Sequence, residues 1–278
     1  MPGQVLGDRY QVERQLGKKA GRWTLLARDL ISDEPVILKL LFIDEDMHRD
    51  DLKLFTREVQ TLQTIEHPNT PRYLGYFEID LAHDGRALAL IQSYISGTSL
   101  EDYLKKRRTL TESETIWLGK AVLKILFYLH NHQPPIVHRD IKPSNVLLSK
   151  DSETNAPVAS LVDFGSVKSF NLSENTSFTL VGTDGYMPPE QMGRRAVRSS
   201  DLYSLGVTML TAMTGQEPSA FPRRGLRIEV EQVEGSDTLQ PAFVDWLKRM
   251  TAPELDKRFQ SAREALQALE SFSSEQPA

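Results

Sequence analysis

Hydrophobic positions in the first third of the chain follow the pattern of several strands and one helix. Residues 36–43, VILKLLFI, are β-branched and apolar, which predicts a mostly buried strand. Two more strands are predicted at 73–80 and 86–95, where the short LAHDGR sequence suits a hairpin turn. Residues 52–65 show one apolar stripe at helical spacing, made by Phe55, Val59 and Leu62.

The hydrophobic pattern becomes helical after Gly97. Thr111 and Glu114 have the spacing of a capping box and open a predicted helix over residues 115–130. The predicted core face of this helix consists of Ile116, Val122, Ile125, Leu126 and Leu129. Residues 202–213 are apolar nearly all round, which predicts a buried helix.

A second capping box is predicted at Ser261 and Glu264, ahead of an apolar helix face formed by Ala265, Leu266 and Leu269. The composition changes near Ser96 and Gly97. This change predicts an α+β protein in which a small β-rich lobe is joined to a larger helical lobe. The expected division is an N-terminal lobe at 1–95, a C-terminal lobe at 96–271, and a tail or linker at 272–278.

Composition narrows the class of protein. The 278 residues suffice for one large domain or two lobes, and 40% hydrophobic with 26% charged residues is ordinary for a soluble globular protein. A net charge of −5 gives no indication of nucleic-acid binding, and the absence of cysteine excludes disulfides, thiolate zinc sites and cysteine nucleophiles. No membrane segment and no signal peptide is predicted, so a cytoplasmic location is expected.

The strongest chemical signal is VHRDIKPSNVLL, at residues 137–148. Phosphoryl transfer to a hydroxyl needs a carboxylate that orients the hydroxyl and takes its proton, a cation near the transferred group, and an oxygen ligand for magnesium. Asp140, Lys142 and Asn145 match these needs in that order. A charged surface turn would explain a lone aspartate, but the whole string matches a protein-kinase signature.

The second signal is LVDFGSVK, at residues 161–168. An apolar strand leads into Asp163, whose carboxylate can hold a hard divalent cation that prefers oxygen ligands. Asp-Phe-Gly alone is a common tripeptide and would be interpreted as a turn. Its position after the Asp140 cluster, with VLL and SLVD as an expected strand pair, favours metal binding.

The third signal is Lys39, which lies inside the apolar strand predicted at 36–43. A lysine there is costly to bury unless its charge is paired. Its ammonium either extends to solvent or pairs with Glu58 on the predicted helix. Such a pair would leave the ammonium able to reach phosphate oxygens on its other side, and the sequence leaves both alternatives open.

Together these motifs resemble eukaryotic-type protein Ser/Thr kinase catalytic domains of bacteria, and HPNTPRYLGYFE and GTDGYMPPEQ resemble cyanobacterial members. The resemblance runs from about Tyr10 to Leu269. It implies a bilobal protein-kinase fold, with a small antiparallel β-sheet lobe carrying one helix and a larger, mainly α-helical lobe. It also implies ATP and Mg²⁺ as cofactors, and protein substrates that bear Ser or Thr.

The resemblance also implies a role for each residue of the three signals. Asp140 would be the catalytic base, and Lys142 would touch the γ-phosphate. Lys39, held by Glu58, would contact the α- and β-phosphates. The implied magnesium ligands are Asn145 and Asp163.

Further nucleotide contacts are implied at two places. Gln92 falls at the gatekeeper position, and the Ser93 carbonyl and the Ile95 backbone would meet the adenine edge. At the phosphates, the implied positions lie in the segment LGKKAGRWTLLARD, at residues 16–29. They are Leu16, Gly17 and Thr24.

This segment departs from the family pattern, because Lys19 and Arg22 stand at the second and third glycine positions. Side chains there should hinder close approach of the backbone to phosphate, while their charges attract the triphosphate. Weak ATP binding with retained chemistry is therefore expected. Replacing both residues with glycine should lower the KM for ATP.

Other residues are implied in support of the site. Glu190 is expected to pair with Arg258, and Asp201 to brace the catalytic loop through backbone N–H groups. His138 is expected to be structural and not a metal ligand.

Hydroxyl residues are abundant between Asp163 and Glu190. The resemblance implies that Arg139 receives an activation-loop phosphate, which leads to the hypothesis of autophosphorylation at Thr176 or Thr179, with self-association as its route. Thr183 is expected in the substrate-binding wall.

Two other functions compete with an active protein kinase. One is a pseudokinase or scaffold with weak or absent ATP turnover, suggested by the degenerate glycine-rich segment. The joint presence of every other catalytic residue opposes it. The other is a small-molecule kinase on a related fold, which GTDGYMPPEQ and Arg258 oppose because they resemble protein-substrate kinases.

Overall fold

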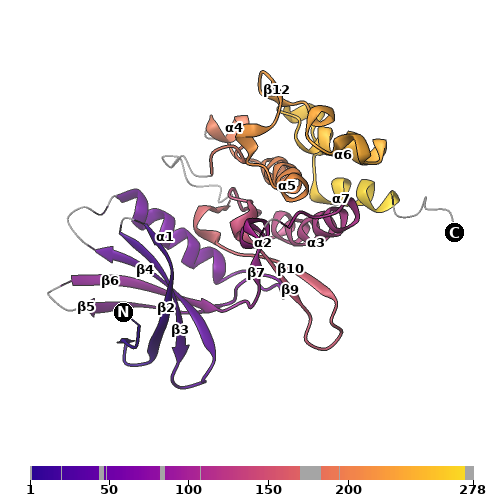
Figure 1. Ribbon diagram of the computed structural model, residues 1–278. Helices are drawn as coiled ribbons and strands as arrows, with labels where there is room; N and C mark the ends of the chain where they lie inside the picture. The colour runs from indigo at the N-terminus through magenta and orange to yellow at the C-terminus, as the bar shows by residue number, and fades with distance from the viewer. Residues whose placement is uncertain are drawn as a thin grey trace. The chain divides into compact units, whose positions relative to one another are not determined.

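The computed structural model describes residues 2–19, 21–43, 47, 49–81, 85–106, 108–169, 183–193 and 195–272. The chain divides into two compact units, Met1–Ser96 and Gly97–Ala278 (Figure 1). Each unit has its own core and is described by itself.

The N-terminal unit is an antiparallel sheet with the order β1-β2-β3-β4-β6-β5, accompanied by one helix, α1 (Arg49–Leu62). Its strands curl in Figure 1. The helix begins and ends three residues before the predicted bounds. The strands are β1 (Val5–Leu6), β2 (Tyr10–Lys19), β3 (Arg22–Asp29), β4 (Pro35–Ile43), β5 (Tyr73–Leu81) and β6 (Gly85–Ser93).

Strand β4 explains why the apolar run VILKLL is continuous. Side chains alternate between the two faces of a strand. Val36, Leu38 and Leu40 belong to the core cluster on one face of the sheet. The residues between them, Ile37 and Lys39 among them, lie on the other face, where helix α1 packs against β4. Both faces of β4 are therefore covered, and Lys39 is placed toward the helix that carries Glu58.

The C-terminal unit is mainly helical. Its α-helices are α2 (Leu100–Lys105), α3 (Glu112–Asn131), α4 (Pro189–Met192), α5 (Arg198–Thr214), α6 (Pro241–Met250) and α7 (Ala262–Ser271). Short strands complete it: β7 (Thr98–Ser99), β8 (Ile136–Val137), β9 (Val146–Lys150), β10 (Pro157–Leu161), β11 (Lys168–Ser169), β12 (Arg223–Arg224) and β13 (Arg227–Ile228). The α+β class predicted from the sequence is confirmed.

The ends of the two predicted capped helices differ from each other. Thr111 and Glu114 form the full capping box of α3, with the Glu114 carboxylate accepting the Thr111 N–H at 2.8 Å. At α7, the Ser261 hydroxyl accepts the Glu264 N–H at 3.1 Å. The Glu264 carboxylate, however, accepts the N–H of Gln260, so the reciprocal half of this box is absent.

The helix cores follow the predicted pattern with two exceptions. Helix α5 buries every residue from Ser199 to Ala212, as its all-round apolar sequence predicts. On α3, Val122, Ile125, Leu126 and Leu129 are buried, but Ile116 is only half-buried because it lies near the start of the helix, beside a cavity. Leu266 on α7 is also half-buried.

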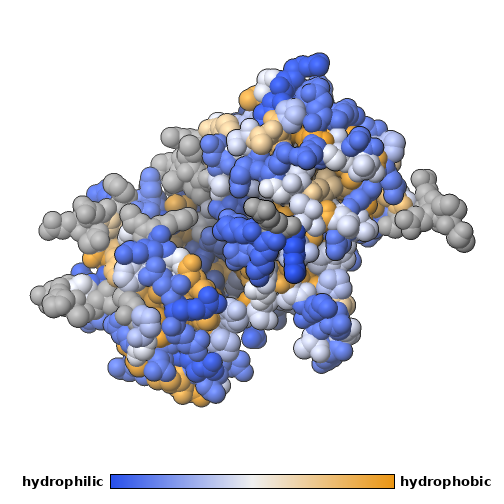
Figure 2. All heavy atoms as spheres, viewed as in Figure 1, coloured by the Kyte–Doolittle hydropathy of each residue, from blue (hydrophilic) through white to orange (hydrophobic). Residues whose placement is uncertain are grey.

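Strands β9 and β10 pair in antiparallel register, with Leu161 opposite Val146. This pairing confirms the expected VLL and SLVD strand pair, and it brings the residues after β10 next to the residues before β9. On the face drawn in Figure 2, hydrophilic residues dominate and hydrophobic ones show in small groups. Within the described ranges, no helix has the length and apolar character needed to cross a bilayer.

Candidate functional site

The loop at residues 138–142, which is held by hydrogen bonds to neighbouring elements, carries the candidate catalytic carboxylate. Asp201, fully buried on α5, accepts the N–H groups of His138 at 2.9 Å and Arg139 at 2.8 Å, and its Oδ2 lies 2.9 Å from His130 Nε2. Gln191 donates its amide to the Arg139 carbonyl at 2.8 Å. These bonds hold Arg139 in the left-handed region, at φ 71°. The expected bracing by Asp201 is therefore present.

The Asp140 carboxylate lies among three polar partners. Thr183 donates its hydroxyl to Asp140 Oδ1 at 2.8 Å, and the Lys142 ammonium is 2.9 Å from Oδ2. Asn145 donates its amide to Oδ2 at 3.1 Å and to the Asp140 carbonyl at 2.8 Å. Lys142 also contacts the Thr183 hydroxyl. A carboxylate, a hydroxyl and a cation thus meet at one point, which is the set that hydroxyl phosphorylation needs.

Asp163 is brought to this cluster by the β9–β10 pair. The N–H of Val162 donates to the Asn145 carbonyl at 2.9 Å, so Asp163 directly follows a residue bonded to Asn145. Asp163 itself has φ 65°, and its Oδ1 accepts the Gly165 N–H at 3.4 Å. A non-glycine residue in this conformation costs energy and marks a functional candidate.

His138 is a fully buried residue beside this cluster. Its ring lies 5.0 Å from that of Phe164 in an edge-on arrangement, and its Nε2 is 3.2 Å from the Val162 carbonyl. Complete burial lowers the pKa of the His138 imidazole, so the ring is neutral at physiological pH. The other ring nitrogen, Nδ1, accepts the Asp140 N–H at 3.4 Å, so both ring nitrogens are engaged within the protein, which agrees with a structural role.

The donor set fits a magnesium ion. The Asn145 amide nitrogen is committed to Asp140, and its Oδ1 accepts no hydrogen bond from any residue the structure describes. Asp163 adds a carboxylate. Across the described ranges, no group of three or more His, Cys, Asp or Glu side chains gathers as a metal cage. Amide and carboxylate oxygens are ligands that suit Mg²⁺, which keeps waters and binds substrate phosphates.

In the N-terminal unit, the Lys39 ammonium contacts Glu58 Oε1 on helix α1. The Lys39 side chain is 13% exposed and that of Glu58 6%. The contact decides between the two alternatives left by the sequence: Lys39 pairs with Glu58 and does not simply extend to solvent.

The glycine-rich segment forms a tight hairpin. Strands β2 and β3 pair up to Lys19 opposite Arg22, with Gly21 in the turn at φ 67°, a value that glycine adopts at little cost. Gly17 lies opposite Thr24, and Leu16 is exposed.

Arg22 does not point its charge freely toward a phosphate. Its Nη2 donates to Asp51 Oδ1 at 2.6 Å and to the Asp51 carbonyl at 3.2 Å, on the first turn of α1. Trp23 packs edge-on against Phe42, with ring centroids 4.8 Å apart, and the Phe42 N–H donates to the Gly21 carbonyl at 2.9 Å. The attraction of the triphosphate by Arg22 stays a prediction, and in the structure its charge is paired with the Asp51 carboxylate.

The candidate adenine-binding residues occupy the end of β6 and the segment after it. Gln92 is buried, and its Oε1 accepts no hydrogen bond in the part of the chain that the structure describes. The Ser93 N–H donates to the Arg72 carbonyl at 2.9 Å. Ile95 forms no backbone hydrogen bond with any described residue. An unsatisfied buried acceptor and an unpaired backbone are typical of positions that a ligand completes.

A buried ion pair holds the segment after Thr183. Arg258, fully buried, donates to both carboxylate oxygens of Glu190, at 2.7 and 3.2 Å, and to the Ser199 carbonyl at 2.9 Å. The Ser200 hydroxyl donates to Glu190 Oε1 at 2.8 Å. The expected Glu190–Arg258 pair is therefore present.

Three contacts of the site were not predicted from the sequence. They are Arg22 with Asp51, Gln191 with the Arg139 carbonyl, and the Thr183 hydroxyl with Asp140. Thr183 was expected only in the substrate-binding wall. The autophosphorylation candidates Thr176 and Thr179 lie outside the described residues, as does the side chain of Lys19.

Comparison with known proteins agrees with this geometry. The profile described as "Protein kinase domain" matches residues 10–269. The chain belongs to the protein kinase domain family. This kinase domain is 35% identical over 280 residues to Serine/threonine-protein kinase B of Synechocystis sp. (strain ATCC 27184 / PCC 6803 / Kazusa), covering 95% of the chain and 47% of that protein.

Two further relatives have related names. Serine/threonine-protein kinase PknA of Nostoc sp. (strain PCC 7120 / SAG 25.82 / UTEX 2576) is 31% identical over 291 residues, covering 96% of the chain and 48% of that protein. Serine/threonine-protein kinase PrkC of Bacillus subtilis (strain 168) is 30% identical over 218 residues, covering 78% of the chain and 32% of that protein. The kinase domain thus spans about half the length of its cyanobacterial relatives, or less of the Bacillus one.

Family membership confirms the predicted resemblance and the kinase fold class, with a sheet lobe and a helical lobe. The three relatives are themselves named serine/threonine-protein kinases.

Proposed function

We propose that this kinase domain transfers the γ-phosphoryl group of ATP to Ser or Thr hydroxyls of proteins. The observation that carries the proposal is the contact of the Thr183 hydroxyl with the Asp140 carboxylate at 2.8 Å, with Lys142 touching both. The site already accommodates a threonine hydroxyl on the carboxylate that would receive the substrate's proton. A substrate Ser or Thr would present the same chemical group.

In this proposal, Asp140 orients the substrate hydroxyl and accepts its proton as the phosphorus–oxygen bond forms. Lys142 places a positive charge beside that carboxylate and near the transferred group. The Asn145 amide fixes the carboxylate through Oδ2, which leaves Oδ1 as the oxygen that receives a hydroxyl. Positioning and charge stabilisation supply most of the rate enhancement in such a site.

The Asn145 side-chain oxygen and the Asp163 carboxylate would hold Mg²⁺, whose charge neutralises phosphate oxygens when it is bound. Asn145 can serve both roles because its nitrogen bonds Asp140 while its oxygen stays available. The left-handed backbone conformation of Asp163 sets the direction in which its side chain leaves the main chain.

Lys39 would contact the α- and β-phosphates of ATP, because Glu58 holds its ammonium in place. The free acceptor of Gln92 and the unpaired backbone of Ile95 support adenine recognition beside Ser93. Leu16, Gly17 and Thr24 would line the phosphate side from the β2–β3 hairpin.

Protein substrates that bear Ser or Thr are the partners this function needs. Autophosphorylation at Thr176 or Thr179 through self-association remains part of the proposal, supported by the hydroxyl-rich sequence that follows Asp163.

The proposal is tested by incubating the protein with Mg²⁺, labelled ATP and a generic protein substrate. Asp140→Asn should lower transfer by roughly 10²–10⁴-fold, because it removes the base. Asp237→Asn is the matched control, since Asp237 is an exposed acid of the same unit. Equal labelling by the natural chain and Asp140→Asn would refute the proposed activity.

A further inference from the structure

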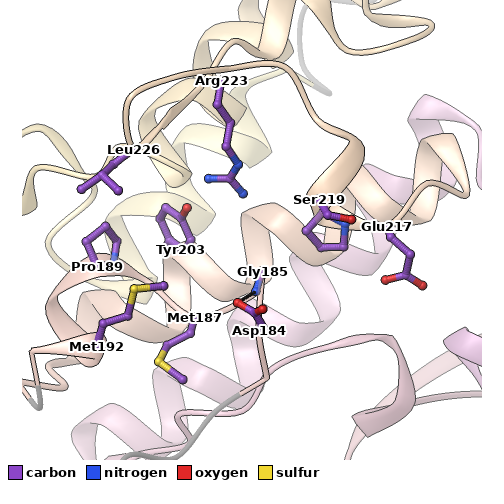
Figure 3. Close-up of a pocket in the computed structure, with 11 residues that line it drawn as sticks. Asp184, Gly185, Met187, Pro189, Met192, Tyr203, Glu217, Ser219, Arg223 and Leu226 are labelled. Carbon is purple, nitrogen blue, oxygen red and sulfur yellow. Dashed lines mark hydrogen bonds between the residues drawn. The ribbon is translucent and has the colours of Figure 1, made fainter.

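A cavity of about 330 Å³ lies in the C-terminal unit beside the segment that follows Thr183 (Figure 3). Asp184 and its neighbours form one side of this cavity. Helix α5 contributes Tyr203, and the β12–β13 hairpin contributes Arg223 and Leu226. All of these residues belong to one compact unit, so the cavity is a property of that unit alone.

The cavity lies close to the candidate reaction centre along the chain. Thr183 bonds the Asp140 carboxylate, and Asp184, which lines the cavity, is the next residue. Consecutive Cα atoms are about 3.8 Å apart, and an extended peptide advances about 3.3–3.6 Å per residue. A substrate whose hydroxyl reaches Asp140 can therefore place a residue within about three positions of that hydroxyl in the cavity.

The hairpin carries three arginines, two of which have carboxylate partners. Arg224 Nη2 is 3.4 Å from Glu229, and Arg227 Nη2 is 2.6 Å from Glu254. The exposed side chain of Arg223 has no ion pair or hydrogen bond with any residue that the structure describes. Strand alternation places it opposite Arg224, and Figure 3 shows its guanidinium directed into the cavity.

The other residues of the cavity wall determine which groups can lie next to an anionic group of a ligand. Met187, Met192 and Leu226 provide an apolar side, and the last two are exposed at 52% and 60%. The wall also holds two carboxylates, Asp184 and Glu217. Asp184 accepts the Gly185 N–H at 2.9 Å, and Glu217 points away from Arg223 in Figure 3. Arg223 is therefore the cation available to a ligand in this cavity among the described residues.

We propose that Arg223 selects protein substrates that carry a glutamate or aspartate within about three residues of the phosphorylated Ser or Thr. Arg223 would donate charge-assisted hydrogen bonds to the acidic side chain, whose methylene groups would pack against the methionines. This inference rests on the proposed kinase function and adds to it a class of substrate and the residue that recognises it.

The test uses peptides with one acceptor Ser and a single Glu, Gln or Lys placed in turn at each of the three positions on either side. At one of these positions, the natural chain should show a kcat/KM about five- to tenfold higher for Glu than for Lys. Arg223→Gln should remove this preference and Arg223→Glu should reverse it. Arg224→Gln is the matched control, and it should keep the natural preference.

The affinities of labelled Glu and Lys peptides for the Asp140→Asn variant give the same comparison without phosphoryl transfer. An unchanged preference in Arg223→Glu, or no acidic preference in the natural chain, would overturn the inference while leaving the kinase function intact. Absence of phosphoryl transfer to every peptide and protein would instead overturn the proposed function. In that case the binding measurement still decides the role of Arg223.

Discussion

Single charged residues of the candidate site are held in fixed places by partners of opposite charge. Lys39 and Glu58 show this most simply. Nineteen positions separate them in the sequence, and an alternating strand and an amphipathic helix bring them together. Both side chains are largely buried, so each charge offsets part of the desolvation cost of the other.

A double-mutant cycle tests this pair without nucleotide. Lys39→Met should lower the free energy of unfolding by roughly 3 kcal/mol, because it leaves a buried carboxylate without this partner. Lys39→Met combined with Glu58→Leu should be more stable than Lys39→Met alone. Urea unfolding provides the measurement. Additive losses in the double variant would contradict a coupled pair.

Which residue contacts can be predicted from the sequence depends on whether a motif fixes both partners. Asp201 with the loop N–H groups and Glu190 with Arg258 follow from motif positions, and both are present. The Arg22–Asp51 pair could not be predicted in this way. Neither residue stands in a motif that names the other, and a surface arginine has many acids within reach.

At the scale of elements, the β2–β3 hairpin and helix α1 act together. The Arg22–Asp51 bonds, the Trp23–Phe42 contact and the bond from Phe42 to Gly21 fix the hairpin to the rest of its unit. Helix α1 also carries Glu58. The β2–β3 hairpin, which occupies the position of the glycine-rich loop, is therefore bonded to the same helix whose Glu58 positions Lys39.

This link reverses part of the expectation drawn from the sequence. Arg22→Met should raise the KM for ATP about two- to fivefold with little change in kcat, because the hairpin loses its attachment to α1. The double variant that combines Arg22→Asp with Asp51→Arg keeps an ion pair with its charges reversed. Its KM for ATP should lie between those of the natural chain and Arg22→Met. Steady-state kinetics at varied ATP provide the measurement.

Arg28→Met is the matched control for that experiment. It removes the Arg28 ion pairs with Glu13, 2.9 Å long, and Asp33, 3.3 Å long, within the same hairpin and the turn after it, and should leave the KM unchanged. A lower KM in Arg22→Met would favour the original expectation that the side chain merely hinders the nucleotide.

Element types were predictable where the hydrophobic period was long and clear, as in α3, α5 and β4. Element ends were less predictable, because local hydrogen bonds decide them. Glu264 shows why: its carboxylate bonds Gln260 and Arg249, so it does not complete the box that its spacing suggests.

At the scale of the whole molecule, one buried ion pair joins distant parts of the helical unit. Arg258 connects helix α4, the start of α5 and the turn at residues 252–253 through its full set of donors. Its guanidinium also lies over the Tyr203 ring at 5.0 Å. A planar, five-donor group is needed to serve all of these partners.

Arg258→Lys should therefore be strongly destabilising despite its conserved charge. We expect a loss of roughly 3 kcal/mol and a melting temperature lower by about 6–12 °C, measured by thermal unfolding. Arg263→Lys, at an exposed position of α7, is the control and should melt like the natural chain. A shift of less than about 2 °C in Arg258→Lys would contradict the structural role assigned to the guanidinium.

In the proposed function, Asp140 is the base that accepts the proton of the substrate hydroxyl. The most direct test of this role measures Mg-ATP affinity and phosphoryl transfer in parallel for the natural chain and Asp140→Asn. The account predicts affinities within about twofold and a transfer rate lower by roughly 10²–10⁴-fold in the variant. Equal transfer rates in the two proteins would contradict it.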